Sequence, residues 1–135
     1  MSRRSKASAD FRPTELQDEF FDHSEDQIAA AQALLDGLHK GGGQGASALG
    51  EFRRIAHSLK GRGTMFEIPS VSAVAAKLED FMAGLVGLSA ADVTGIRRYF
   101  DQLDAIVEAR RDLVEPELSE RLGKLPSPRR AGSKD

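Results

Sequence analysis

Cysteine and tryptophan are absent from the chain, and its 135 residues include 1 tyrosine and 7 phenylalanines. Without cysteine, disulfide bonds and thiolate metal sites cannot form. Because aromatic side chains are so few, a core has to be built mainly from aliphatic residues, and a hydrophobic content of 40% is enough to fill one. A chain of this length favours one domain with room for tails.

Long hydrophobic runs are missing too. The apolar stretches are far shorter than the roughly 18 residues that a membrane span requires. The chain begins with Met-Ser-Arg-Arg-Ser-Lys and continues without a hydrophobic stretch, which is unlike a secretory signal. We therefore expect a cytoplasmic protein without a membrane partner.

Basic residues are scarce in the body of the chain. The formal net charge of −2 divides into +3 for residues 1–12, −9 for residues 13–120 and +4 for residues 121–135. Basic ends of this kind can contact nucleic acid. Since they are short and rich in Ser, Pro and Gly, we interpret residues 1–12 and the chain from Pro126 onward as disordered, solvated tails without a nucleic-acid partner.

Apolar residues recur at helical spacing through the body, and turn-forming residues divide them into segments. The predicted helices cover residues 14–38, 46–66, 70–85 and 89–114, and a short helical segment follows at 117–125. No segment alternates apolar and polar residues as a half-buried strand would. We therefore expect an all-α fold, with an antiparallel (up-down) four-helix bundle over residues 13–115 and a short helical segment and basic tail over 116–135.

Local signals support these boundaries. Two pairs fit a capping box, namely Thr14 with Gln17 and Ser89 with Asp92. Ser70, after Pro69, is the predicted cap of the third helix. The glycine cluster at 41–45 lacks the Gly-Lys-Ser/Thr ending of a phosphate-binding P-loop, so we interpret it as a flexible connector.

The second predicted helix carries a histidine on its polar side. At about 100° per residue, one face collects His57, Lys60, Gly61 and Thr64. The opposite face collects Phe52, Ile55, Leu59, Gly63 and Phe66. The apolar face therefore anchors the helix, and the imidazole is predicted to face solvent or a partner.

Two glycines sit inside this helix, although each costs about 1 kcal/mol relative to alanine. Gly63 lies on the buried side, where it could allow close helix packing. Gly61 lies beside His57 on the exposed side, where the missing side chain would let another molecule reach the ring. Lys60 could screen a phosphate on that ring, and Arg53 and Arg54, one turn earlier, would extend the positive charge unless they are ordinary solvated residues.

The segment His57-Ser58-Leu59-Lys60-Gly61 resembles the His-x-Leu-Lys-Gly signature of histidine-containing phosphotransfer (HPt) domains, the intermediates of multistep phosphorelays. The likeness spans about residues 14–112: Gly63 and Phe66 fit the family's pattern, and Leu78-Glu79 matches its downstream apolar-Glu pair. The chain departs at Glu67, where family members often have glycine, which bears on the local turn and on partner choice.

The resemblance implies a function. His57 would carry a phosphoryl group on a ring nitrogen and exchange it with an aspartate of a receiver domain, while Lys60 gives electrostatic support and Gly61 gives access. The docking surface would be bordered by Arg53, Arg54, Arg62, Thr64 and Met65. The partners would be receiver domains of response regulators and of a hybrid histidine kinase. The receiver would bring Mg²⁺, and this chain would need no cofactor, metal or nucleotide and would be a carrier, not an enzyme.

Other interpretations stay open. A helical adaptor could bind receiver domains without being phosphorylated, or oligomerise through the apolar stripe of the fourth helix. Glu67 favours that alternative, and the presence of His57, Lys60 and Gly61 together argues against it. A histidine kinase would need a separate ATP-binding domain, and a dimeric kinase-like phosphotransfer domain is less favoured than a self-contained monomer. His23 and His39 lie on segments separate from His57 and lack the spacing of metal ligands.

Overall fold

The computed structural model describes residues 11–39 and 45–128. This part of the chain contains five helices: α2 (Glu15–His39), α3 (Gly45–Met65), α4 (Pro69–Met82), α5 (Ala90–Ala109) and α6 (Glu117–Gly123). Because the described residues contain no strand, the all-α prediction is confirmed. Among the same residues, no helix has the length and apolar character needed to cross a membrane.

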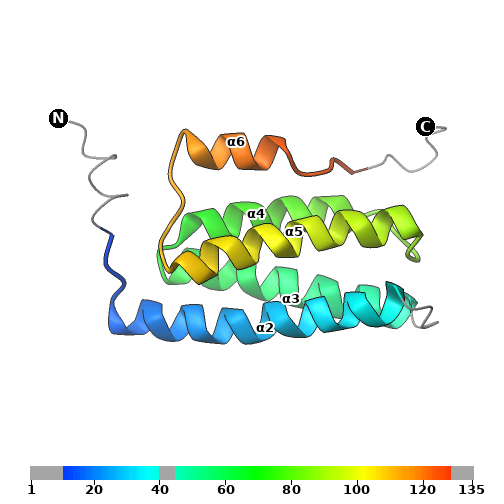
Figure 1. The fold of residues 1–135 in the computed structure, drawn as a ribbon, viewed down its shortest axis with the longest axis horizontal. Coiled ribbons are helices and arrows are strands. Elements are labelled where there is room, and N and C mark those ends of the chain that lie inside the picture. The colour runs from blue at the N-terminus through cyan, green and yellow to red at the C-terminus, as the bar shows by residue number, and fades with distance from the viewer. Residues whose placement is uncertain (1–10, 40–44, 129–135) are drawn as a thin grey trace.

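The four long helices form the predicted antiparallel bundle (Figure 1). Helix α2 packs against α3 and α5, and α4 packs against the same two helices, so α3 and α5 lie diagonally across the bundle. The short helix α6 runs along the outside and contacts α4. The face of α3 that points away from the bundle is therefore left uncovered by α5 and α6.

The core fills the space between the four long helices. Phe52 of α3 and Phe100 of α5 meet at its centre, with ring centroids 5.9 Å apart. The stripe of α5 that could have served oligomerisation is part of this core, since Ile96, Phe100, Leu103 and Val107 are fully buried. It is therefore not available as an interface, and that form of the adaptor alternative is wrong.

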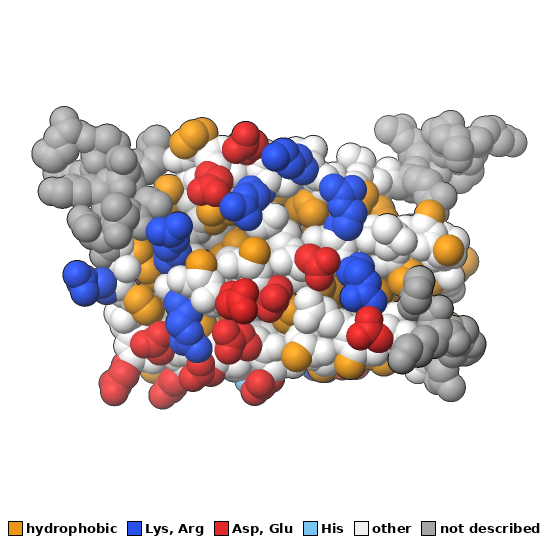
Figure 2. All heavy atoms as spheres, in the orientation of Figure 1, with side chains coloured by type: hydrophobic (Ala, Val, Ile, Leu, Met, Phe, Trp, Pro, Cys, Tyr) orange, Lys and Arg blue, Asp and Glu red, His pale blue; other side chains and the backbone are white. Residues whose placement is uncertain are grey.

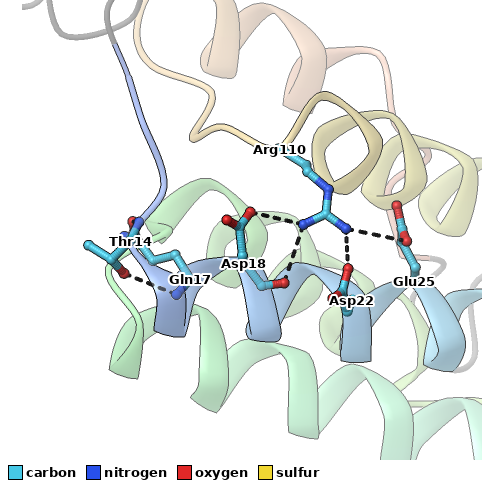
Figure 3. Close-up of polar contacts among 6 residues, drawn as sticks. All are labelled: Thr14, Gln17, Asp18, Asp22, Glu25 and Arg110. Atoms are coloured by element: carbon cyan, nitrogen blue, oxygen red, sulfur yellow. Dashed lines mark hydrogen bonds and ion pairs between the residues drawn. The ribbon is translucent and has the colours of Figure 1, made fainter.

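Both predicted capping boxes are present. Thr14 and Gln17 exchange two hydrogen bonds of 3.0 Å at the start of α2 (Figure 3). Ser89 and Asp92 exchange two, of 3.0 and 3.1 Å, at the start of α5. The amide Nε2 of Gln17 also donates to the carbonyl of Phe66, at 2.8 Å. The beginning of α2 is thereby tied to the turn that follows α3.

The predicted cap at Ser70 is wrong. The cap position of α4 is Ile68, without a side-chain hydrogen bond, and Pro69 is the first helical residue. Proline suits that position because its φ is already helical and the missing N–H would have no partner there. Ser70 is fully buried instead, where its Oγ accepts from the Leu113 amide and its own amide donates to Asp112.

Arg110 fastens the end of α5 to α2 (Figure 3). It ends α5 with a left-handed backbone, at φ 56°. Its guanidinium group binds the carbonyl and the carboxylate of Asp18, pairs with Asp22 and lies 3.8 Å from a carboxylate oxygen of Glu25. It also lies 5.9 Å from the ring centroid of Phe21. One side chain thus joins two adjacent helices of the bundle, α5 and α2.

The ordered domain extends beyond the predicted boundaries at both ends. Phe11, within the predicted tail of residues 1–12, packs against the core. After α6, Leu125 is buried and the carbonyl of Pro126 accepts a hydrogen bond from the hydroxyl of Tyr99. Residues 1–10 and 129–135 of the predicted tails lie outside the described residues, and so do residues 41–44 of the predicted connector, whereas Gly45 begins α3.

Helices α3 and α4 approach each other closely at Gly63. A Cβ atom at this position would lie 2.5 Å from Oγ and 2.8 Å from the amide nitrogen of Ser72. At Gly61, a Cβ atom would meet nothing within 4 Å. The two glycines predicted to differ in role therefore do differ in their surroundings, and Gly63 allows close packing.

We predict opposite effects of adding a methyl group at these glycines. Gly63→Ala should lower the free energy of unfolding by about 1–2 kcal/mol, because the contact with the α4 backbone has to open. Gly61→Ala should raise it by up to about 1 kcal/mol, since alanine is the better helix former. Urea denaturation of both variants measures the difference, and equal effects would contradict the packing described for Gly63.

Tyr99 gives a second test of the fold. Its burial, together with the negative charge of Asp80, raises the pKa of Tyr99 to about 12. Because this is the protein's 1 tyrosine, tyrosinate absorbance should titrate in one step near that value. In denaturant the step should return to about 10. The folded state keeps a proton that the unfolded state loses, so stability should fall between these pH values; a native titration at about 10 would contradict this burial.

Candidate functional site

His57 stands on the uncovered face of α3, and 77% of its side chain is exposed. One ring nitrogen, Nδ1, lies 3.0 Å from Oε2 of Glu79 on α4. One turn further along α3, the position of Gly61 opens onto free space. The imidazole is thus outward, as its place on the polar face predicts, and is also held by a neighbouring helix.

Glu79 links His57 to Lys60. While Oε2 faces the imidazole, Oε1 lies 2.6 Å from the ammonium nitrogen of Lys60. The Glu79 side chain is only 25% exposed, whereas 40% of the Lys60 side chain is exposed. A single carboxylate from α4 therefore fixes two side chains that are one turn apart on α3.

The charge of Glu79 is stabilised by these two contacts. Burial alone would raise the pKa of Glu79, but the hydrogen bonds from Lys60 and His57 outweigh it and hold the pKa below its usual value. The carboxylate is therefore ionised at neutral pH and can only accept hydrogen bonds. In a neutral imidazole beside it, Nδ1 carries the proton and Nε2 keeps its lone pair. This tautomer presents Nε2 to the outside.

Two hydroxyl groups bind the backbone carbonyl of Lys60. The carbonyl of Lys60 accepts from Oγ of Ser72 at 2.7 Å and from Oγ1 of Thr64 at 3.3 Å. The two hydroxyls also lie 3.0 Å from each other. Thr64, predicted to border the docking surface, therefore contributes its hydroxyl group to the contact between α3 and α4.

In the turn after α3, Glu67 adopts a backbone conformation that is usual for glycine. The amide of Ile68 donates to the carbonyl of Gly63 at 2.8 Å, and the amide of Glu67 donates to that of Thr64 at 3.2 Å. This is the Schellman pattern, in which the residue at the Glu67 position takes a left-handed backbone and is usually glycine. Glu67 adopts it, at φ 64°, at a cost of about 1–2 kcal/mol. The turn geometry is therefore kept without the glycine.

The cations predicted around His57 have different surroundings. Nη2 of Arg53 donates to the carbonyls of Met82 and Leu85, at 2.7 Å each, and so satisfies the end of α4. Arg54 is exposed and pairs with Glu51 on its own helix. Of the two, Arg54 is therefore the more accessible to another molecule.

The remaining predicted docking residues border two hollows between α3 and the start of α2. Arg62 lines one of them, together with Leu16, Glu19, Phe20, His23 and Phe66. Met65 lines the other, together with Thr14, Leu16, Gln17, Phe66 and Glu67. Met65 is 72% and Leu16 is 61% exposed, so this end of the surface is apolar. Leu16 was not singled out from the sequence, because its place in the apolar pattern of its helix suggested burial.

Sequence reasoning also missed the contact of Glu79 with His57. In the sequence, Glu79 stands out only as part of the Leu78-Glu79 pair, and that pair does not show which residue Glu79 contacts. The other histidines stay apart: His23 is exposed on α2, and His39 is the last residue of that helix. No group of three or more His, Asp or Glu side chains within residues 11–39 and 45–128 is arranged to hold a metal ion.

Comparison with protein families adds an independent finding. The family model described as Hpt domain matches residues 15–112, from the start of α2 to just after the end of α5. Comparison with curated proteins and with solved structures gives no match. Hpt domains are helical phosphotransfer modules of phosphorelays. With an exposed histidine in the matched region and a helical bundle around it, the chain belongs to the Hpt domain family.

Proposed function

We propose that the protein relays a phosphoryl group between His57 and receiver-domain aspartates in a multistep two-component phosphorelay. The observation that carries this proposal is an imidazole that is 77% exposed and has Nδ1, not Nε2, against a carboxylate. A buried ring, or one with both nitrogens engaged, would not suit an acceptor. The arrangement leaves one nucleophilic nitrogen accessible to a large partner.

The transfer step follows from this tautomer. The Nε2 lone pair attacks the phosphorus of a receiver's aspartyl phosphate, the new P–N bond forms, and the P–O bond to the aspartate breaks. The aspartate leaves as a carboxylate. Since Nε2 carries no proton in this tautomer, none has to leave. The ring gains positive charge as the bond forms, and Glu79, 3.0 Å from Nδ1, stabilises that charge. The reverse step returns the phosphoryl group to an aspartate.

Lys60 and Gly61 assist in different ways. The ammonium group of Lys60 has three donors, and one of them binds Glu79 at 2.6 Å, so others are available to phosphoryl oxygens. Gly61 has nothing within 4 Å of the place where its side chain would be. We propose that this gap admits the backbone of the receiver as it brings its aspartate into line with Nε2.

The partners proposed are receiver domains of response regulators and of a hybrid histidine kinase. Each receiver would contribute the aspartate and the Mg²⁺ ion, whereas this chain would contribute the imidazole, the Lys60 charge and the docking surface. In this role it is a carrier without a nucleotide site or cofactor of its own, and it acts as a monomer in the cytoplasm. No membrane or nucleic-acid partner is part of the proposal.

The docking surface proposed includes Arg53, Arg54, Arg62, Thr64 and Met65. The exposed Met65, with Leu16 beside it, offers apolar area at one end of α3. Arg54 offers positive charge on the other side of His57. An acidic receiver site suits that charge, and burial of the apolar end would add affinity. Arg53 and Thr64 support the surface through the contacts they make with α4.

An adaptor that binds receivers without accepting phosphate remains the second candidate. The observation that favours the adaptor is Glu67, which stands where family members often have glycine. Glu67 keeps the hydrogen bonds of the turn but has the left-handed backbone that suits glycine. The two candidates share a docking surface and differ in whether His57 is ever phosphorylated. A labelling experiment therefore separates them.

We predict that radiolabelled phosphate passes from phosphorylated receiver domains to the natural chain and not to His57→Gln. The label should be acid-labile and base-stable, as a phosphohistidine is. Because the side chain of His57 is 77% exposed, the variant should keep its fold, which circular dichroism checks. Label that persists in His57→Gln would refute the assignment of the acceptor. Absence of label from the natural chain with every receiver tested would favour the adaptor.

We predict graded losses of transfer rate on changing Glu79. Glu79→Gln keeps an oxygen that can accept from Nδ1 but removes the charge, so transfer should slow moderately. Glu79→Leu removes both and should slow it by about 10- to 100-fold, the range seen when a group that orients a metal-binding histidine is lost. Asp80→Asn, on the same helix, is the matched control and should change little. If all three variants behaved alike, Glu79 would have no role in positioning the ring.

A further inference from the structure

The contact between His57 and Glu79 also bears on the ring after it has accepted a phosphoryl group. With that group on Nε2, the ring has one other nitrogen, Nδ1, which either carries a proton or presents a lone pair. Nδ1 lies 3.0 Å from Oε2 of Glu79. Because Glu79 is ionised and can only accept hydrogen bonds, a lone pair on Nδ1 would face another acceptor at that distance. The geometry therefore favours a phosphorylated ring that keeps the proton on Nδ1.

Glu79 is held in place against the ring. Its other oxygen, Oε1, lies 2.6 Å from the ammonium nitrogen of Lys60, and its side chain is 25% exposed. The cations of α3 near the imidazole are each compensated by a carboxylate, since Lys60 binds Glu79 and Arg54 pairs with Glu51. From α2, the uncharged Gln27 contacts this part of α3. The carboxylate of Glu79 is therefore the charge that acts on Nδ1 directly.

A phosphoryl group on Nε2 would also be open to solvent. The side chain of His57 is 77% exposed, and a Cβ atom at Gly61 would meet nothing within 4 Å. Helix α5 is diagonal to α3 and lies on the side of the bundle that Figure 2 shows, where acidic side chains gather over α2. Water can therefore reach the phosphorus whenever no partner covers this face of α3.

We infer that the phosphorylated chain is a short-lived phosphoryl donor and not a store, because Glu79 keeps Nδ1 of His57 protonated while Nε2 carries the phosphoryl group. This inference rests on the proposed function and concerns the lifetime of its intermediate. Two features of the site carry it: the position of the carboxylate at Nδ1 and the exposure of the ring.

The release step shows why the proton matters. An oxygen of a receiver's aspartate, or of water, attacks the phosphorus, the new P–O bond forms and the P–N bond breaks. The electron pair of the broken bond returns to Nε2, so the ring leaves as neutral imidazole with its proton still on Nδ1. When water attacks, its hydrogens stay with the phosphate that forms. A ring without the proton on Nδ1 would have to leave as an imidazolate anion, which is a far poorer leaving group.

The state of Nδ1 can be measured on the full chain after it has been phosphorylated by a receiver domain and separated from it. In ¹⁵N NMR at about pH 8, where a histidine ring free in water is neutral, Nδ1 of phosphorylated His57 should carry a proton. In Glu79→Gln it should not, because the side-chain amide can donate to a lone pair on Nδ1 and so keeps the contact without the charge. Phosphorylated His57 without a proton on Nδ1 in the natural chain would overturn this inference and leave the proposed function standing. Absence of phosphohistidine at His57 would overturn the proposed function, and this inference with it.

The lifetime of the phosphoryl group gives a second readout. At the same pH, loss of phosphate to water, followed by ³¹P NMR, should be about three- to tenfold slower in Glu79→Gln than in the natural chain, the effect of losing one hydrogen bond to a charged group. The difference should shrink toward acid pH, where both rings are protonated. Asp80→Asn removes a carboxylate from the next position of α4 and should keep the natural lifetime.

Three results of this comparison would overturn the inference. The first is an equal lifetime in Glu79→Gln and the natural chain, and the second is an equal lengthening by Asp80→Asn. The third is a difference that stays the same at every pH, because it would mean that Glu79 positions the ring without affecting its proton.

Discussion

The close approach of α3 and α4 at Gly63 is the constraint on which the functional face depends. No side chain fits there, since a Cβ atom would lie 2.5 Å from Ser72. With the backbones this close, Ser72 reaches the carbonyl of Lys60, and the carboxylate of Glu79, two turns further along α4, reaches His57. A wider separation would leave the imidazole exposed but free to rotate. Packing at one glycine thus determines how the ring is presented.

Stability and function use different sides of α3. Its apolar side is buried in the core, where Phe52 meets Phe100 of the diagonal helix. Arg110, at the end of α5, further stabilises the bundle by binding Asp18 of α2. The outward side carries His57, whose side chain is 77% exposed, and Gly61, where an added Cβ atom would meet nothing within 4 Å. Family membership agrees with this division, in which the bundle supports the exposed imidazole of His57. Phosphoryl transfer requires mainly positioning and charge compensation, which such a support can supply.

Helical periodicity was sufficient to predict the bundle and the outward face of His57, because both follow from which residues share a side of one helix. It could not predict Glu79 as the partner of His57, since that contact depends on the register between two helices. The expected cap at Ser70 failed for a local reason: Pro69 can begin a helix without a capping side chain. The exposure of Leu16 was not predicted, because Leu16 lies in the apolar pattern of α2. Its neighbours nevertheless leave it 61% exposed.

We propose that Glu79 holds the proton of His57 on Nδ1 and leaves Nε2 free to accept a phosphoryl group. The most direct measurement is the ¹⁵N NMR spectrum of the ring nitrogens in the unphosphorylated chain, near or above neutral pH, with His57→Gln used to assign the signals. We expect a protonated Nδ1 and an unprotonated Nε2 in the neutral ring. A neutral ring that carries its proton on Nε2, or signals unchanged in Glu79→Leu, would contradict it.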